Sequence, residues 1–417
     1  MRFSSTSVLL LASLSVLLLT ACESADPVGS KNNGGDGVVT PEAFAERVSA
    51  TNELAFNLYH RLAGGDDNLM VSPHSIAVAF ATVYAGARST TEEEIAEALC
   101  FPCPQGGFHS AMQALNDSLT SRGRDQGADV FKLNIANSCW GDEDWHYEQA
   151  YLDTLARFYG APMRLVDLAG QPEQARLAIN QWMADQTEDR VPELIPPGAL
   201  CGGSYLVLAN AIYFRACWLK QFKTEYTHDE GFMLLDGTTI QVPTMTGMDE
   251  FDYCSGDGYR AVDLAYVGEQ VSMLAVLPDS GQFAAFEAGF DEARLEEIQA
   301  QLVPTDIFIQ LPRFSFETPL DLKETLTAMG MTEAFGVGAD FTGMDGTDDG
   351  MPWINGVWHR TFISVDEYGT EAAAGTGIEM YLSIMPYFSA DRPFLFVICD
   401  RPTGTVLFMG RVLDPRG

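Results

Sequence analysis

The chain is poor in positive charge. Its 417 residues include 24 lysines and arginines against 58 aspartates and glutamates, so the formal net charge is −34. Lysine occurs only at positions 31, 132, 220, 223 and 323. Nucleic acids and other polyanions are bound through clustered lysine and arginine, so this composition argues against them as partners. The acidic residues are spread along the chain, which favours a role in solubility.

Motifs for catalysis and for metal binding are also missing. The sequence has no GxxxxGK(S/T), no GxGxxG that opens a helix, no HExxH and no GxSxG. The acidic loop from Asp340 to Gly350 departs from a calcium-binding EF-hand at Thr347, and again at Gly356, where that pattern has a glutamate. We therefore predict that the protein is not an enzyme and has neither a metal site nor a cofactor.

No hydrophobic run is long enough to span a bilayer comfortably. The run from Val8 to Leu19 follows Arg2 and has the length of the apolar region of a signal peptide. It ends in Leu19-Thr20-Ala21-Cys22, which resembles the bacterial lipobox and implies cleavage before Cys22 and lipidation of its thiol. We predict a lipoprotein signal peptide over 1–21 and a flexible tether over 22–41. We expect a lipid anchor in the outer membrane or at the cell surface; secretion is the alternative.

The cysteines do not form a complete set of pairs. Without Cys22, seven of the 8 remain, so at least one thiol of an exported protein stays unpaired. Cys100 and Cys103 have CxxC spacing, but they follow a predicted helix and lie among prolines. A redox motif needs a helix N-terminus to lower a thiol pKa, so we predict a local disulfide or a simple loop. A zinc site would need a second such pair, which the chain lacks.

The remainder, 42–417, is predicted to be one domain with helices early and strands late. Periodicity and end signals predict helices over 41–63, from Pro73, over 90–99 with Thr90 as the cap, and over 148–158, 172–187, 283–301 and 320–329. Apolar runs predict strands over 130–138, 204–214, 259–264, 271–277, 306–311 and 357–365, and a hairpin around 400–404. The segment 115–129 is polar. This order favours an α+β fold over repeated βαβ units.

The stretch from Val365 to Met385 is patterned as a strand but contains loop residues. From Thr370 onward, one face of a strand would carry only uncharged side chains, and the other would carry Glu371 and Glu379. Glycines weaken a strand, and Gly369 lies at the start of the patterned segment like a hinge. An edge strand or an alanine-rich helical turn also fits this pattern.

Several blocks, in the same order, resemble the serpin family. Phe388 to Ile398 resembles the family's C-terminal signature, and Glu367 to Thr376 resembles the hinge of its reactive-centre loop. Further matching blocks are Asn68–Arg88, Asn180–Trp182 with Thr187, Asn210–Trp218, Leu311–Phe314 and Asp340–Met344. The resemblance extends over about 41–417.

The resemblance implies an α+β serpin fold with three β-sheets, eight or nine helices and an exposed reactive-centre loop. It also implies a suicide inhibitor of serine endopeptidases, with cysteine endopeptidases as a second target class. The loop is cleaved, the protease is held as an acyl-enzyme, and the cut loop inserts into the central sheet. A non-inhibitory serpin that acts as a binding or carrier protein is the alternative. We expect a monomer.

The resemblance assigns roles within the loop. The hinge comprises Glu367, Gly369, Thr370, Glu371, Ala372, Ala373, Ala374 and Thr376. Family spacing from Glu367 places the scissile bond between Ser383 and Ile384, whereas spacing from Arg392 favours the bond between Leu382 and Ser383. No arginine or lysine lies nearby, so the expected targets are elastase-, chymotrypsin-, subtilisin- or cathepsin-like rather than trypsin-like.

The resemblance also assigns a sheet-opening region: Ser72, Ser75, Asn210, Trp218 and His359. These residues match ones that lie beneath or beside the sheet where the loop inserts, which implies that they control its opening. Tyr368, Gly375 and Gly377 depart from the family pattern, and the two glycines are expected to slow insertion. No basic cluster precedes Val130, so no heparin site is expected.

Overall fold

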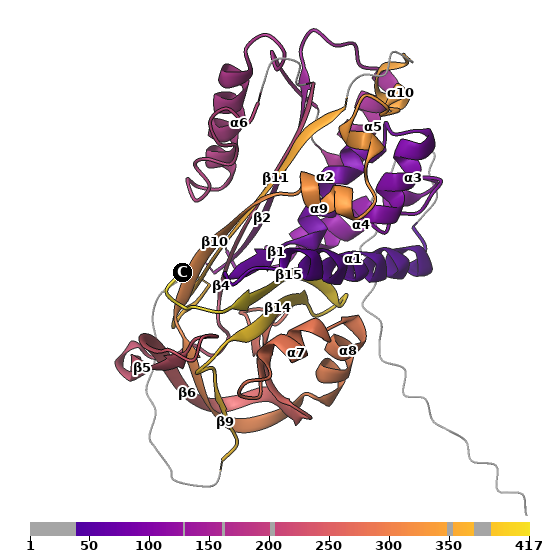
Figure 1. The fold of residues 1–417 in the computed structure, drawn as a ribbon. Coiled ribbons are helices and arrows are strands. Elements are labelled where there is room, and N and C mark those ends of the chain that lie inside the picture. Colours follow the sequence, from indigo (N-terminus) through magenta and orange to yellow (C-terminus); the bar gives the residue numbers. More distant parts are fainter. Residues whose placement is uncertain (1–38, 128–129, 161–162, 201–204, 348–352, 371–384) are drawn as a thin grey trace, which may run out of the picture. The chain divides into compact units, whose positions relative to one another are not determined.

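The computed structural model describes the chain except for residues 1–38, 128–129, 161–162, 201–204, 348–352 and 371–384 (Figure 1). The α-helices are α1 (Pro41–Leu62), α2 (Pro73–Tyr84), α3 (Ser89–Ala98), α4 (Phe108–Thr120), α5 (Gln149–Tyr159), α6 (Pro172–Gln186), α7 (Phe283–Ala288), α8 (Glu292–Gln301), α9 (Lys323–Ala328) and α10 (Thr342–Asp345). Two short 3-10 helices are η1 (Thr224–Tyr226) and η2 (Glu333–Phe335).

In chain order, the first eight strands are β1 (Leu69–Val71), β2 (Phe131–Asp142), β3 (Arg164–Val166), β4 (Leu206–Cys217), β5 (His228–Met233), β6 (Thr239–Gly256), β7 (Tyr259–Ala265) and β8 (Val271–Pro278). The remaining strands are β9 (Val303–Pro312), β10 (Phe314–Asp321), β11 (Ile354–Val365), β12 (Gly369–Thr370), β13 (Tyr387–Ser389), β14 (Phe394–Asp400) and β15 (Thr405–Val412).

The described strands form two hydrogen-bonded sheets. The six-stranded sheet has the order β10-β11-β4-β2-β3, with β12 paired to β4. The nine-stranded sheet has the order β1-β15-β14-β8-β7-β6-β9-β13, with β5 paired to β6. Three sheets were expected. The difference comes from β6, whose 18 residues pair with β5 at one end and with β7 at the other, so that the two parts are continuous.

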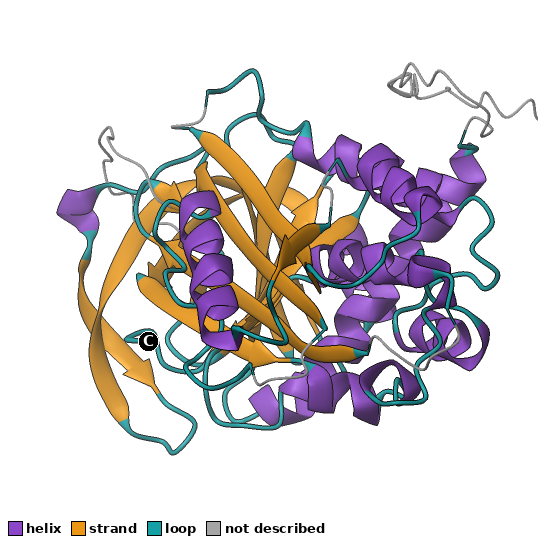
Figure 2. Cartoon of the chain, turned by 90° about the horizontal axis from the view of Figure 1, so that it is seen from above, coloured by secondary structure: helices purple, strands orange, loops and turns teal. Residues whose placement is uncertain are grey.

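Helices cover both faces of the six-stranded sheet. Leu206 and Leu208 of β4 belong to the same buried cluster as Ile76 of α2, whereas Val207 and Ala209 pack with the residues of α6. Successive residues of a strand point to opposite faces, so α2 and α6 lie on opposite sides of β4. Figure 1 shows α6 on one side of the long strands and α2 on the other, and Figure 2 shows the same arrangement by element type.

The α+β architecture predicted from the sequence is confirmed, with ten α-helices among the described residues where eight or nine were expected. The single helix predicted over 283–301 is in fact two helices, α7 and α8. It breaks where Asp291 accepts a hydrogen bond from the backbone N–H of Arg294 (2.8 Å) and starts α8. Phe290 is fully buried at this break. The predicted closing hairpin is confirmed as β14 and β15.

Other local predictions were wrong. Thr90 lies inside α3, whose N-cap is Arg88. The helix predicted from Leu320 begins at Lys323, because Leu320 belongs to β10 and pairs with His359 of β11. Helix α4 extends into the segment 115–129, which the sequence analysis interpreted only as polar. The helix was missed because its apolar face was not recognised. For Cys100 and Cys103 the sequence left two alternatives, a local disulfide or a simple loop; both residues are free thiols, so the loop is the alternative that the structure confirms.

Candidate functional site

The chain turns back on itself at the end of β11. The backbone N–H of Asp366 donates to the carbonyl of Gly369 (2.9 Å), and the N–H of Gly369 donates to the carbonyl of Asp366 (3.3 Å). The Asp366 carboxylate accepts a further hydrogen bond from the N–H of Tyr368 (2.9 Å). Strand β12 follows immediately and pairs antiparallel with the end of β4. Residues of the predicted hinge therefore form a tight turn that directs the chain back along the sheet.

Gly369 is required at this turn by both its conformation and its surroundings. Its φ is +149°, a region that side chains disfavour, and it pairs with Cys217 of β4. An added Cβ would lie 2.1 Å from the carbonyl oxygen of Ala216 and 2.6 Å from the Cα of Cys217. Both atoms belong to the backbone and cannot rotate away, so only glycine fits.

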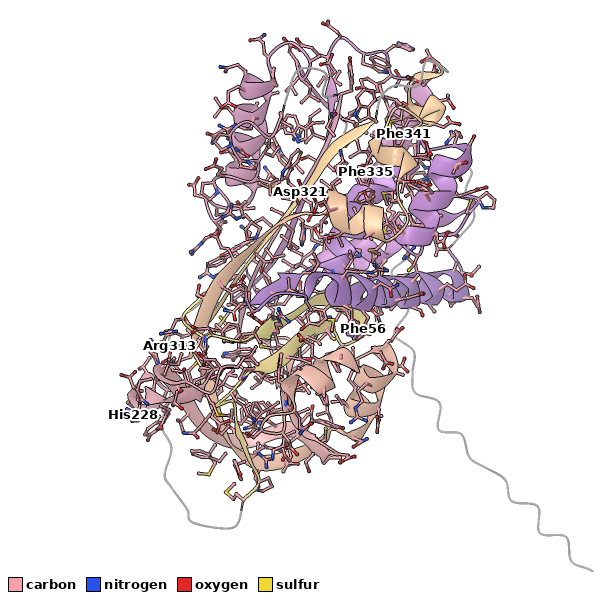
Figure 3. All side chains as sticks on the ribbon, viewed as in Figure 1. Phe56, His228, Arg313, Asp321, Phe335 and Phe341 are labelled. Carbon is pink, nitrogen blue, oxygen red and sulfur yellow. The ribbon has the colours of Figure 1, made fainter. Side chains whose placement is uncertain are left out.

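Glu367 anchors the same turn from inside the protein. Its side chain is 1% exposed and accepts hydrogen bonds from Arg313 (Nε to Oε1, 2.8 Å) and from the hydroxyl of Thr227. Burial raises the pKa of Glu367, but these hydrogen bonds outweigh it and hold the pKa below its ordinary value. Arg313 directly precedes β10, and Thr227 directly precedes His228, the first residue of β5 in the other sheet; Figure 3 labels Arg313 and His228 in the same part of the view. Glu367 is therefore an ionised group whose Oε1 is held by Arg313 and Thr227.

Trp218 holds the turn from the other side. Its indole N–H donates to the carbonyl of Asp366 (3.0 Å), and its backbone N–H donates to the carbonyl of Tyr368 (2.8 Å). The indole stacks on Tyr266, with ring centroids 4.5 Å apart. These contacts place Trp218 at the turn, one residue beyond β4.

Below this turn, β4 and β11 are direct neighbours. They are parallel, and the pairs extend from Ile354 with Leu206 to Phe362 with Tyr213. In contrast, β12 is antiparallel to β4, pairing Gly369 with Cys217 and Thr370 with Ala216. The segment predicted to be the reactive-centre loop therefore begins as an antiparallel strand at the end of the parallel β4–β11 pair, whose junction we call the seam.

A polar network crosses the seam near the middle of β4 and β11. Asn210 and His359 are register partners on β4 and β11 and are almost fully buried. The Asn210 amide donates to the backbone carbonyl of Ser75 (2.9 Å) and to the Ser75 hydroxyl (2.6 Å). The backbone N–H of Ser72 donates to Nε2 of His359 (3.3 Å). The network thus connects both strands of the seam to the N-terminus of α2.

The network fixes the protonation state of His359. Because Nε2 accepts a hydrogen bond from Ser72, the proton lies on Nδ1, which donates to the side-chain oxygen of Asn210. Burial lowers the pKa of His359 to about 3. The imidazole is therefore neutral at any physiological pH.

The structure places the predicted sheet-opening residues at two sites. Ser72, Ser75, Asn210 and His359 lie together in the network, and Trp218 lies apart from them at the turn. Three further residues were not predicted: Asn137 of β2, which accepts a hydrogen bond from Asn210, and the Glu367 partners Arg313 and Thr227. Arg313 had a signal, because it lies in the block Leu311–Phe314, which was recognised only as a resemblance.

Some predicted residues lie outside the described part of the chain: Cys22, Glu371, Ala372, Ala373, Ala374, Thr376, Leu382, Ser383 and Ile384. Within the described ranges no three histidine, cysteine or acidic side chains are grouped so that they could bind a metal ion. No helix among the same residues has the length and hydropathy needed to cross a membrane.

Known proteins resemble this chain over most of its length. A family model described as serpin (serine protease inhibitor) matches residues 49–415. An uncharacterized serpin-like protein of Thermococcus kodakarensis is 36% identical over 375 residues, covering 88% of this chain and 86% of that protein. The leukocyte elastase inhibitor of Sus scrofa is 34% identical over 385 residues, covering 89% and 100%. The solved structure of human thyroxine-binding globulin has a TM-score of 0.81 at 28% identity, covering 90% of this chain and 100% of that one.

Proposed function

The chain belongs to the serpin family, and on that basis we propose that it inhibits serine endopeptidases by loop cleavage, acyl-enzyme trapping and strand insertion. Cysteine endopeptidases are a second target class. The family model describes inhibitors of proteases, not catalysts, and the pig relative is named an elastase inhibitor. Thus inhibition is supported at the level of the family, and the proposal adds the mechanism and the residues.

One observation supports insertion most directly, namely the position of β12. Its two residues pair with the end of β4, antiparallel to β4 and therefore also to the parallel β11. Continuation of β12 between β4 and β11 would give a strand that is antiparallel to both neighbours. Before cleavage the far end of the loop is tied to β13, so the segment is free to continue only after a bond in 371–384 is cut.

Insertion is favourable because it adds one ladder to the sheet. The existing β4–β11 ladder is lost, and two new ladders form, one on each side of the new strand. A strand of about ten residues gains on the order of ten hydrogen bonds, each worth roughly 1 kcal/mol net. The gain, on the order of 10 kcal/mol, is similar to the whole stability of an ordinary domain.

The chemistry requires one bond exchange. The protease nucleophile attacks the carbonyl carbon of Ser383, the amine of Ile384 leaves with a proton, and Ser383 remains as an ester or thioester on the protease. Displacement by the inserting strand then separates this ester from the groups that would hydrolyse it. The bond between Leu382 and Ser383 is the alternative, with the same exchange one residue earlier.

The proposal is tested by incubating the protein with elastase, chymotrypsin, subtilisin and papain, followed by denaturing electrophoresis. We expect a covalent complex with at least one of them and none with trypsin. Mass spectrometry of the released C-terminal peptide then identifies the bond, by whether the peptide begins at Ile384 or at Ser383. Complete cleavage with no covalent complex in every reaction would refute the inhibitory function.

A carrier function is the second candidate, and one comparison favours it. Human thyroxine-binding globulin, whose name states a ligand, has the same fold. The hinge argues against this function, because Thr370, Ala372, Ala374 and Thr376 are small and uncharged, as an inserting face requires. Loop cleavage that leaves the thermal stability unchanged would support the carrier function.

We also propose that the chain is exported as a monomer and anchored through Cys22, in the outer membrane or at the cell surface. The support is the apolar run ending in Leu19-Thr20-Ala21-Cys22. Labelling of expressing cells with a fatty-acid probe is expected to mark the wild type and not Cys22→Ser. Labelling of both variants would contradict the anchor.

A further inference from the structure

The segment after α6 crosses the seam between β4 and β11. We call residues 187–194 the strap. Val191 and Leu194 of the strap are buried in the same cluster as Ala209 and Ala211 of β4 and Trp358 of β11. Beyond the pair of Thr370 with Ala216, the next positions of β4 toward its start are Arg215 to Asn210. The strap covers the sheet at that level, directly along the path of an inserting strand.

On one side the strap is attached to β2. The carboxylate of Glu188 forms an ion pair with the ammonium group of Lys132, a residue near the start of β2. The hydrogen bond from Lys132 holds the pKa of Glu188 below its ordinary value, and the charges of Arg215 and Arg190 act in the same direction. Lys132 is paired in register with Arg215 of β4, so this attachment moves with β2 and β4.

On the other side the strap is attached to β11. The guanidinium of Arg360 donates to the backbone carbonyl of Glu193 and forms an ion pair with Glu317 of β10. The guanidinium of Arg190 lies over the ring of Phe362, 5.6 Å from its centroid. Arg360 and Phe362 belong to β11, so this attachment moves with β11 and β10.

The strap is also held in a costly backbone conformation. Glu188 and Asp189 are consecutive residues with positive φ, 53° and 60°. Aspartate adopts positive φ more readily than most residues, so the cost falls mainly on Glu188, whose conformation persists because surrounding contacts hold it. The ion pair of Glu188 is one such contact.

An inserting strand must separate the two attachments. A new strand between β4 and β11 moves the strands on either side apart by about 4.8 Å. A hydrogen bond is lost once donor and acceptor are more than about 3.5 Å apart, so the contacts to Lys132 and to Arg360 cannot both survive. The attachments therefore oppose the movement that insertion requires.

We propose that the strap is an ionic clasp across the β4–β11 seam, and that the Lys132–Glu188 pair sets the rate at which the seam opens. The proposal rests on the inhibitory function, because only insertion requires the seam to open. Lys132 and Glu188 act here as positioning residues that do not touch the protease.

The test compares Lys132→Met and Glu188→Gln with Arg294→Met. The control removes an ion pair of similar exposure on α8, since Arg294 and Glu297 are 28% and 50% exposed, against 28% and 54% for Lys132 and Glu188. Two rates are measured for each protein: protease trapping, and uptake of a synthetic peptide with the sequence of residues 370–382 by the uncut protein. We expect both rates to rise about two- to fivefold in the clasp variants, the range for losing one exposed ion pair.

Two further measurements separate a clasp from a general loss of stability. The charge exchange Lys132→Glu with Glu188→Lys is expected to return the rates part of the way to the wild-type values, because Arg190 and Arg215 remain close to position 188. About 1 M salt is expected to raise the wild-type rates and leave those of Lys132→Met nearly unchanged. Rates in the clasp variants equal to those of Arg294→Met would overturn the clasp while the inhibitory function stands. Absence of trapping and of peptide uptake in the wild type would overturn both.

Discussion

At Gly369 the start of the predicted reactive-centre loop lies against the backbone of β4. An alanine there would place its Cβ 2.1 Å from a carbonyl oxygen, at a φ of +149°. We expect Gly369→Ala to lower the free energy of unfolding by about 1–3 kcal/mol, as for other strained backbone positions. Urea unfolding measures the loss.

Gly237→Ala is the control for this substitution. Gly237 also has a positive φ, +83°, but an added Cβ would meet nothing within 4 Å. The difference between the two variants therefore isolates the contact with β4. Equal losses would mean that the turn at Gly369 relaxes without cost.

The buried carboxylate of Glu367 gives a second prediction at the same scale. Glu367→Gln removes the charge that Arg313 pairs with, and we expect a loss of about 1–2 kcal/mol at neutral pH, the range for a hydrogen bond to a charged group. Arg313 is 43% exposed and is partly rehydrated, which limits the loss. Because the pKa of Glu367 is lowered, its contribution is present at neutral pH and disappears as pH falls below about 4.5. Urea unfolding at neutral and acidic pH is expected to show the two proteins converging.

At the scale of the element, the continuation of β12 has two chemically different faces. In an inserted strand Ala372 would lie on the face that carries Thr370, and Ala373 on the face that carries Glu371. We expect Ala372→Glu to lower the trapped fraction of protease at least tenfold, because a buried unpaired carboxylate costs several kcal/mol. Denaturing electrophoresis of protease mixtures measures the trapped and cleaved fractions.

Ala373→Glu is the matched control, since it makes the same chemical change one residue away. Its carboxylate would face solvent, so the trapped fraction is expected to stay close to that of the wild type. If both variants trap equally well, the segment does not insert in this register.

Elements were predictable where local pattern and tertiary environment agree. Helices α1 and α6 begin with Pro41 and Pro172 as predicted, because the proline signal is local. The break between α7 and α8 was missed, because the need to bury Phe290 arises from packing. Strand β12 could not be predicted from the sequence either, since its pairing depends on the end of β4, more than 150 residues earlier.

At the scale of the whole molecule, the buried His74 and His359 and the half-buried His109 make stability dependent on pH. Burial lowers the pKa of His74 and His109 to about 4 and that of His359 to about 3, from 6.5. The unfolded chain binds protons below about pH 6.5 that the folded chain does not, so stability falls as pH decreases. Each histidine contributes up to about 1.4 kcal/mol per pH unit.

The pH effect is measured by urea unfolding at about pH 7, 6 and 5, above the range in which most carboxylates titrate. We expect His109→Gln to show a shallower decrease than the wild type, by up to about 1.4 kcal/mol per pH unit. His146→Gln is the control, because the His146 side chain is 74% exposed. An identical pH dependence in His109→Gln would show that His109 is protonated in the folded protein.

The sequence by itself determined the alternation of the loop segment and its small uncharged face, because these are properties of a single strand; the need for glycine at 369 comes from the backbone of β4. Only the tertiary structure decided which groups meet. Asn210 and His359 are 149 positions apart, and Arg313 and Glu367 are 54 apart. The ends of the strap are likewise held by β2 and β11, which adjoin opposite sides of β4. Such contacts depend on the order of strands in the sheet, which local pattern does not encode.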